Sequence, residues 1–163
     1  MRGAISNALG VEVASISPKT VLTRDLDAES LDFLDISYHL EQTFGFKMAR
    51  HFVLEHAEEL FGEGKATDEN GCLTAEAVRM LRLRFNDAPG FLRPGMDMDE
   101  AAHLVTVDSL VNNVLDILDS LPETCPECGH ASWKTDDGIH ILCGSCGAAA
   151  AYKTGDDLML DWL

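Results

Sequence analysis

The apolar residues of the first 120 positions recur mostly at the three- and four-residue intervals of α-helices. Leu31, Leu34 and Tyr38 show this spacing, Phe44 continues the apolar pattern, and Gly45 is a typical helix end. The pattern predicts a helix that begins near residue 30 and stops at Gly45.

Similar patterns predict further helices over residues 52–61 and 74–85, a short helical turn over 99–103, and a last helix over about 107–118. Residues 86–95 contain two prolines and two glycines, which predicts a loop. Four or five helices with short connections form a small bundle. We therefore expect an all-α helical bundle over residues 1–120, with a stretch at about 49–103 that is long for a mere connection.

The composition changes at Pro122, which would stop the preceding helix. The segment 121–163 contains four cysteines in two C-x₂-C pairs, and Asp136-Asp137-Gly138 between them is typical of a hairpin turn. The tail 157–163 is largely apolar, so it closes the hairpin or packs against the helical region. We expect a second, small domain over residues 121–163.

The spacing of these cysteines predicts a metal centre with four thiolate ligands. The ligands are Cys125, Cys128, Cys143 and Cys146. The segment resembles a zinc ribbon or a rubredoxin-type knuckle pair; zinc is favoured and iron is the runner-up. The alternative is two redox-active or disulfide-bonded pairs. Four protein ligands leave no open coordination position for catalysis, and His130 and His140 are not expected to be ligands.

The net charge of −16 excludes some partners. It repels phosphate backbones and anionic membrane surfaces, so we expect neither nucleic-acid binding nor membrane insertion, and we favour partners with basic faces. No stretch reaches roughly 18 consecutive apolar residues, and the start shows no export signal. A cytoplasmic monomer is expected, and in such a chain paired cysteines favour metal over disulfides.

One serine stands at the predicted start of an acidic helix, in the segment Glu29-Ser30-Leu31-Asp32. A hydroxyl at a helix N-terminus lies where free N–H groups and the helix dipole favour an attached phosphate. The alternative is an ordinary N-cap serine. Ser109 also stands in an Asp-Ser-Leu tripeptide, but it is followed by Val111 where Ser30 is followed by Asp32.

The segment around Ser30, the helix end Leu40-Glu41-Gln42-Thr43-Phe44-Gly45-Phe46 and the closing helix from Thr106 resemble the acyl carrier proteins. The resemblance implies a small helical bundle with 4′-phosphopantetheine attached to Ser30 and acyl groups held as thioesters. It departs from the family's pattern in three ways. Glu29 replaces an aspartate, the segment before Val11 is short for a first helix, and residues 49–103 are inserted.

The insertion resembles the expanded carriers for unusual or very long acyl chains. Its apolar residues include Phe52, Val53, Leu60, Phe61, Val78, Leu81, Leu83 and Phe85. They either enlarge a cavity for a long chain or only pack the added helices, and the sequence favours neither alternative.

The acidic residues near Ser30 suggest a docking face for a phosphopantetheinyl transferase and for acyl-transferring or synthase enzymes with basic faces. The residues that we expect to serve partner recognition are Glu29, Leu31, Asp32, Asp35 and Glu41. A merely solvated helix face is the alternative.

The function that the sequence predicts is an acyl carrier in fatty acid, lipid or polyketide-type biosynthesis. No serine or cysteine is visibly paired with a base, so we do not expect an enzyme. The alternative is a carrier-like adaptor that has no arm and uses the metal ribbon for protein docking.

Overall fold

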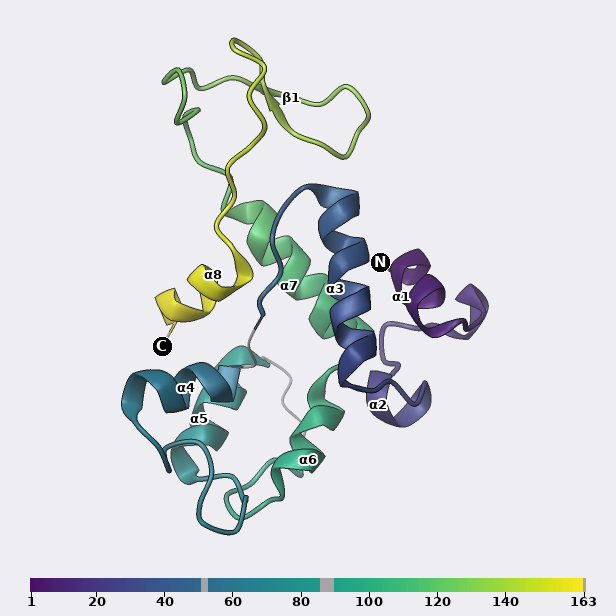
Figure 1. The fold of residues 1–163 in the computed structure, drawn as a ribbon, viewed down its shortest axis with the longest axis vertical. Coiled ribbons are helices and arrows are strands. Elements are labelled where there is room, and N and C mark those ends of the chain that lie inside the picture. The colour runs from purple at the N-terminus through teal and green to yellow at the C-terminus, as the bar shows by residue number, and fades with distance from the viewer. Residues whose placement is uncertain (51–52, 86–89, 163) are drawn as a thin grey trace.

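The structure, a computed structural model, describes residues 1–50, 53–85 and 90–162. Figure 1 shows a helical region with a small two-stranded ribbon at one end and the inserted helices at the other. The helices and strands are α1 (Arg2–Leu9), α2 (Leu22–Asp25), α3 (Ser30–Phe44), α4 (Val53–Phe61), α5 (Ala75–Arg84), α6 (Met98–Ala101), α7 (Val107–Asp119), β1 (Trp133–Lys134), β2 (Leu142–Cys143) and α8 (Gly155–Trp162), with short 3₁₀ turns at Val13–Ser15 and Ala102–Leu104.

The elements α1, α2, α3 and α7 share one apolar core, which we call the main core. Its buried residues are Ile5, Ile16, Leu22, Ala28, Ile36, Leu40, Phe46, Met48, Val107, Leu110, Val114 and Ile117. Each large aliphatic side chain removed from water in this way contributes about 1.5–3 kcal/mol. The helix ends follow local rules: α3 ends at Gly45, whose left-handed φ of 74° suits glycine, and Thr106 caps α7.

The insertion forms a core of its own, the insertion core, from α4, α5, α6 and their connections. Its buried residues are Leu54, Ala57, Ala66, Leu73, Ala77, Val78, Met80, Leu81, Leu92, Met96, Ala101 and Leu104, joined by Met159 from α8. Thr74 caps α5 by accepting a hydrogen bond from the backbone N–H of Ala77. Val78 and Leu81 pack the added helices, whereas Phe61, another apolar residue of the insertion, is 46% exposed.

Beyond α7 the chain forms the ribbon. Strands β1 and β2 pair antiparallel, with Trp133 opposite Cys143 and Lys134 opposite Leu142. The helical bundle followed by a hairpin ribbon confirms the predicted fold class. After the ribbon, α8 returns to the helical region, where it contacts both α4 and α7.

Three of the described helices were not predicted: α1, the short α2 and α8. The segment before Val11 contains a full helix, α1, which buries Ile5 and packs against α3. The tail forms α8, which packs on the helical region; it does not close the hairpin. Phe52, the predicted start of the second helix, and residues 86–89 of the predicted loop lie outside the described residues. Among the described helices, none has the length and apolar character needed to cross a bilayer.

Candidate functional site

Ser30 is the first residue of α3, and the preceding Glu29 is the N-cap. Glu29 and Asp32 form a capping box, in which the backbone N–H of Glu29 donates to Asp32 Oδ2 at 2.8 Å. Capping is therefore performed by the neighbours of Ser30. Its exposed side chain has no hydrogen-bond partner within the described residues, so the N-cap alternative does not apply and the hydroxyl is free to react.

Ser109, the competing serine, is held in a different way. It is the third residue of α7 and forms a capping box with Thr106. Its Oγ donates to the backbone carbonyl of Thr106 at 2.8 Å and accepts from the N–H of Thr106 at 3.0 Å. The hydroxyl is half-buried and fully used for capping, which explains Ser109 as a structural residue.

The surface next to Ser30 combines a hollow and an apolar ridge. The hollow is open and is lined by Thr23, Ala28, Glu29, Ser30, Leu31 and Phe33. Along α3, three apolar side chains share one face, because they lie three and four residues apart. Leu31 is 76% exposed, Leu34 50% and Tyr38 55%. Ser30 thus stands at the end of an uncovered apolar ridge.

The four acidic residues predicted for partner recognition differ in their exposure. Glu29 and Asp35 are exposed beside the ridge, and Asp35 forms a long ion pair, 3.8 Å, with His39. Asp32 is half-buried, and its carboxylate accepts a hydrogen bond from the backbone N–H of Glu29. The fourth acidic residue, Glu41, lies elsewhere.

Glu41 differs from the prediction, since it is only 4% exposed. Its carboxylate accepts hydrogen bonds from Lys47 Nζ, from Arg50 and from the buried backbone N–H of Met48, each at 3.0 Å. A carboxylate with these partners holds the segment after α3 against the helix. It is not available to a partner protein.

The sequence prediction missed Asp27, three residues before Ser30. Its φ is 52°, and it is the one non-glycine residue with positive φ in the described part of the chain. Aspartate tolerates this left-handed region better than most residues, and the turn allows Ala28 to be buried. Asp27 is itself exposed and adds a carboxylate to the surface near Ser30.

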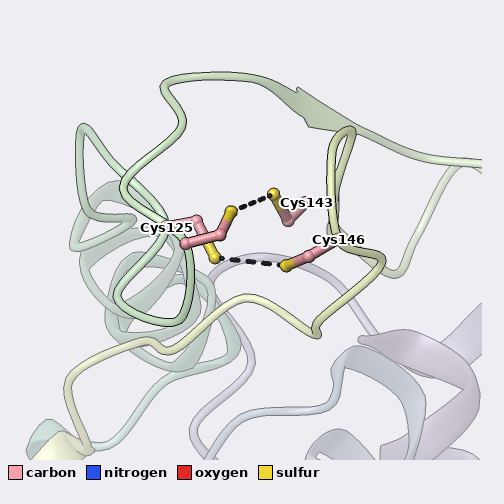
Figure 2. Close-up of side chains that lie close together, drawn as sticks. Cys125, Cys143 and Cys146 are labelled. Atoms are coloured by element: carbon pink, nitrogen blue, oxygen red, sulfur yellow. Dashed lines mark hydrogen bonds between the residues drawn. The ribbon is translucent and has the colours of Figure 1, made fainter.

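The four predicted metal ligands lie together. The Sγ atoms of Cys125, Cys128, Cys143 and Cys146 are all within 4.8 Å of one another. Two of the contacts between sulfurs, drawn as dashed lines in Figure 2, measure 3.8 Å between Cys125 and Cys146 and 3.6 Å between Cys128 and Cys143. A tetrahedral zinc ion with Zn–S bonds of about 2.3 Å requires sulfur–sulfur distances of about 3.8 Å. All five cysteines are free, which contradicts the disulfide alternative.

The two cysteine knuckles have the same backbone geometry. In each, the N–H of the glycine after the second cysteine donates to the carbonyl of the first: Gly129 to Cys125 at 2.8 Å, and Gly147 to Cys143 at 3.0 Å. Both glycines have positive φ, 72° and 77°, which other residues rarely adopt. The knuckle backbone therefore explains the glycine that follows each pair.

The backbone favours the thiolate form of one of the four cysteines, Cys143. The N–H groups of Cys146 and Ser145 point to the Cys143 sulfur and lower its pKa to about 6. The Ala148 N–H acts in the same direction on Cys146, but the Cys128 thiol, burial and the other two thiols outweigh it and raise the pKa of Cys146 to about 12. A metal cation bound by the four sulfurs would favour the thiolate form of every cysteine, so that the neighbouring thiols would no longer raise the pKa of Cys146.

The histidines of the ribbon are outside the cluster, as expected. His140 Nδ1 instead lies 2.5 Å from Asp137 Oδ2. This contact and the N–H groups of Ile139 and His140 hold the pKa of Asp137 well below its usual range.

Residues 1–58 match the family model described as the phosphopantetheine attachment site. Comparison with curated proteins and with solved structures finds no match. The matched region includes Ser30 and covers α1, α2 and α3. Domains of this type are carriers of acyl groups and not enzymes, and they imply a 4′-phosphopantetheine prosthetic group. The match thus supports a phosphopantetheine-carrying protein, and the cysteine cluster is compatible with zinc.

Proposed function

We propose that the chain is an acyl carrier protein that holds 4′-phosphopantetheine on Ser30. The observation that carries this proposal is the free, exposed hydroxyl at the first position of α3, inside the region that matches the attachment-site family. Acyl groups are held as thioesters at the end of the arm. The protein serves fatty acid, lipid or polyketide-type biosynthesis as a cytoplasmic monomer.

The start of α3 suits a phosphate linked to Ser30 Oγ. The first turn of a helix carries free backbone N–H groups and the positive end of the helix dipole, and both favour a phosphodiester over neutral groups. The open hollow with Ala28 and Phe33 gives the arm an apolar surface close to its attachment point. The chain supplies position and reach, and the enzymes that it visits supply the chemistry.

Glu29, Leu31 and Asp35 form the recognition face in this proposal, while Asp32 fixes the turn that presents Ser30. Leu31 offers the largest exposed apolar contact next to the serine, and the carboxylates guide basic faces towards it. Association should be fast at low ionic strength and slower at high salt, because salt screens exposed charges beyond about 10 Å at 0.1 M.

The insertion places the chain among the expanded carriers for unusual or very long acyl chains in this proposal. Supporting this is the size of the addition, which has a separate core between Leu54 and Leu104. The core buries its own side chains, and the hollow beside it, which is lined by Ala75, Val78, Arg79, Arg82 and Pro94, is open to solvent. We therefore assign the insertion to partner selection or domain stability, and not to enclosure of the acyl chain.

The four cysteines hold a structural zinc ion in this proposal. The ribbon has strands of only two residues and few buried side chains, so a metal must supply most of its stability. All four ligands come from the protein, which leaves no position for a substrate. Four thiolates also accept iron, which absorbs visible light whereas zinc is colourless.

The decisive experiment is co-expression with a phosphopantetheinyl transferase, followed by mass spectrometry of the intact protein. We expect the wild type to gain one arm and Ser30→Ala to gain none. Ser109→Ala is the matched control, because it changes the other serine of similar context and should still be loaded. Circular dichroism checks that both variants are folded.

An unmodified wild type would contradict the carrier proposal and favour the armless adaptor that uses the ribbon for docking. Loading that persists in Ser30→Ala and disappears in Ser109→Ala would transfer the site to α7.

A further inference from the structure

The C-terminal helix α8 lies between the two apolar cores of the helical region. We propose that residues 152–159 form a strap that fastens the insertion to the main core, and that metal binding by the four cysteines controls how firmly this strap is docked. The device adds a structural coupling to the carrier function and does not depend on the arm at Ser30.

The strap contacts both cores through different side chains. Met159 is 8% exposed and belongs to the insertion core. Leu158 and Tyr152 pack against the main core, and the ring of Tyr152 meets that of Phe46 edge-on with centroids 6.4 Å apart. Adjacent residues of one short helix thus join two cores that otherwise bury separate sets of side chains.

The backbone of the strap is held just as closely. The N–H of Gly155 donates to the carbonyl of Lys47 at 2.9 Å, and the N–H of Arg50 donates to Asp156 at 2.9 Å. A Cβ on Gly155 would lie 2.2 Å from the backbone nitrogen of Ala49, a distance that no real structure tolerates. Gly155 is therefore required for this approach, because only a residue without a side chain lets the two backbones meet.

The strap is also connected to α3. Arg50, whose N–H is held by Asp156, donates from its guanidinium to the buried carboxylate of Glu41. A displacement of α8 would therefore disturb the segment between α3 and the insertion.

The ribbon determines where the strap begins. Its two stems are tied by the hydrogen bond from Lys153 N–H to Ser120 Oγ at 2.9 Å, and Trp133 Nε1 donates to the Pro122 carbonyl at 2.9 Å. Between these stems, distant residues of the ribbon are connected by the cluster of four cysteines, by the pairing of β1 with β2, and by the hydrogen bond from the Gly144 N–H to the Ser132 carbonyl at 2.7 Å. Without metal, the two cysteine knuckles would lose their common centre and the ribbon would hold residue 153 less firmly, leaving the hydrogen bond of Lys153 to Ser120 as the contact at the start of the strap. The docking of α8 would then be weaker.

Hydrogen exchange measured by mass spectrometry on the zinc-loaded and the chelator-treated full chain tests this coupling. We expect removal of zinc to accelerate exchange about tenfold or more at the amides of Arg50, Gly155 and Leu158. The hydrogen bonds of these amides break when the strap detaches from the helical region. Exchange within α1 and the middle of α7 should change little. The arm at Ser30 is not needed for either measurement.

Two variants separate the strap from the metal. Gly155→Ala should accelerate exchange in α8 and at Arg50 while one zinc ion per chain is retained. Gly3→Ala is the matched control, because it adds the same methyl group where nothing lies within 4 Å. Asp156→Ala, which removes the acceptor of the Arg50 N–H, should act like Gly155→Ala.

The proposal is overturned if α8 stays equally protected after zinc is removed, since the ribbon would then be an independent appendage. It is also overturned if protection is lost to the same extent in α1 and α7, because the metal would then support the whole fold and not the strap. Unchanged exchange in both variants would likewise contradict it.

Discussion

Asp32 Oδ2 accepts a hydrogen bond from the backbone N–H of Glu29 across 2.8 Å, and this contact fixes the turn that presents Ser30. Because the two residues flank the serine on either side, the capping box leaves the hydroxyl itself without a structural task. An acidic residue two positions after the serine thus has a conformational role in addition to its charge.

Asp32→Ala should lower the free energy of unfolding by about 1 kcal/mol, because it removes half of a capping box. Asp32→Asn keeps an oxygen acceptor and should lose less. Urea denaturation measures both. Asp35→Ala is the control, since Asp35 forms an exposed ion pair whose loss costs little. If Asp32→Ala and Asp35→Ala were equally stable, the capping role of Asp32 would be disproved.

The left-handed backbone of Asp27 gives a second prediction. Asp27→Gly should raise the free energy of unfolding by about 0.5 kcal/mol, and Asp27→Ala should lower it by about 1 kcal/mol, because alanine tolerates positive φ less well. Asp27→Asn keeps the conformational tolerance but removes the charge, so its stability should match the wild type. If the transferase loads Asp27→Asn more slowly than the wild type, the difference is then due to the lost charge and not to a change of backbone conformation.

The features that the sequence predicted are those that depend on neighbours along the chain. The start of α3 follows from the helical spacing after Ser30, and the metal centre follows from two C-x₂-C pairs, whose knuckles are closed by their own glycines. Both are local patterns whose geometry is largely set by residues within one turn.

The features that the sequence did not predict depend on distant contacts. The role of Glu41 is set by Lys47, Met48 and Arg50, which fold back only because the chain turns at Gly45. The strap is set by a contact between Arg50 and Asp156, which are 106 positions apart. Neither residue type nor spacing indicates such a contact, since tertiary packing decides it.

Replacement of the buried Glu41 by glutamine should lower the free energy of unfolding by about 1–3 kcal/mol, because the buried Met48 N–H and two cations lose a charged acceptor. Lys47→Ala is the control: this side chain is 63% exposed and returns to water at little cost. Transferase loading of Glu41→Gln should be unchanged. A large loss of loading without a loss of stability would restore the original assignment of Glu41 to partner recognition.

Metal analysis of the purified protein should find one zinc ion per chain and no visible absorption band. Cys128→Ser should lower zinc affinity, because it removes one of the four thiolates of the cluster. Cys72→Ser is the control, since Cys72 lies outside the cluster and should leave the zinc content unchanged. A coloured protein with iron in place of zinc would reverse the choice of metal.

Acid should weaken the loop before α5 through Glu58. The carboxylate of Glu58 accepts from the N–H groups of Thr67 at 3.0 Å and Ala66 at 2.8 Å, and these hydrogen bonds lower its pKa below the ordinary value. A carboxyl whose pKa is lowered by folding stabilises the protein fully above its unfolded pKa of about 4.3. That stability is lost as the pH falls through the lower, folded pKa.

Glu58→Gln should therefore lower the melting temperature at pH 7, and the difference from the wild type should shrink as the pH falls below about 4, where the wild-type carboxyl becomes neutral as well. Thermal unfolding of both proteins between pH 7 and pH 3 measures this. Glu63→Gln provides a control of equal charge change at an exposed residue just after α4, and should show no comparable convergence. A constant difference between Glu58→Gln and the wild type across this range would mean that the charge of Glu58 does not hold the loop.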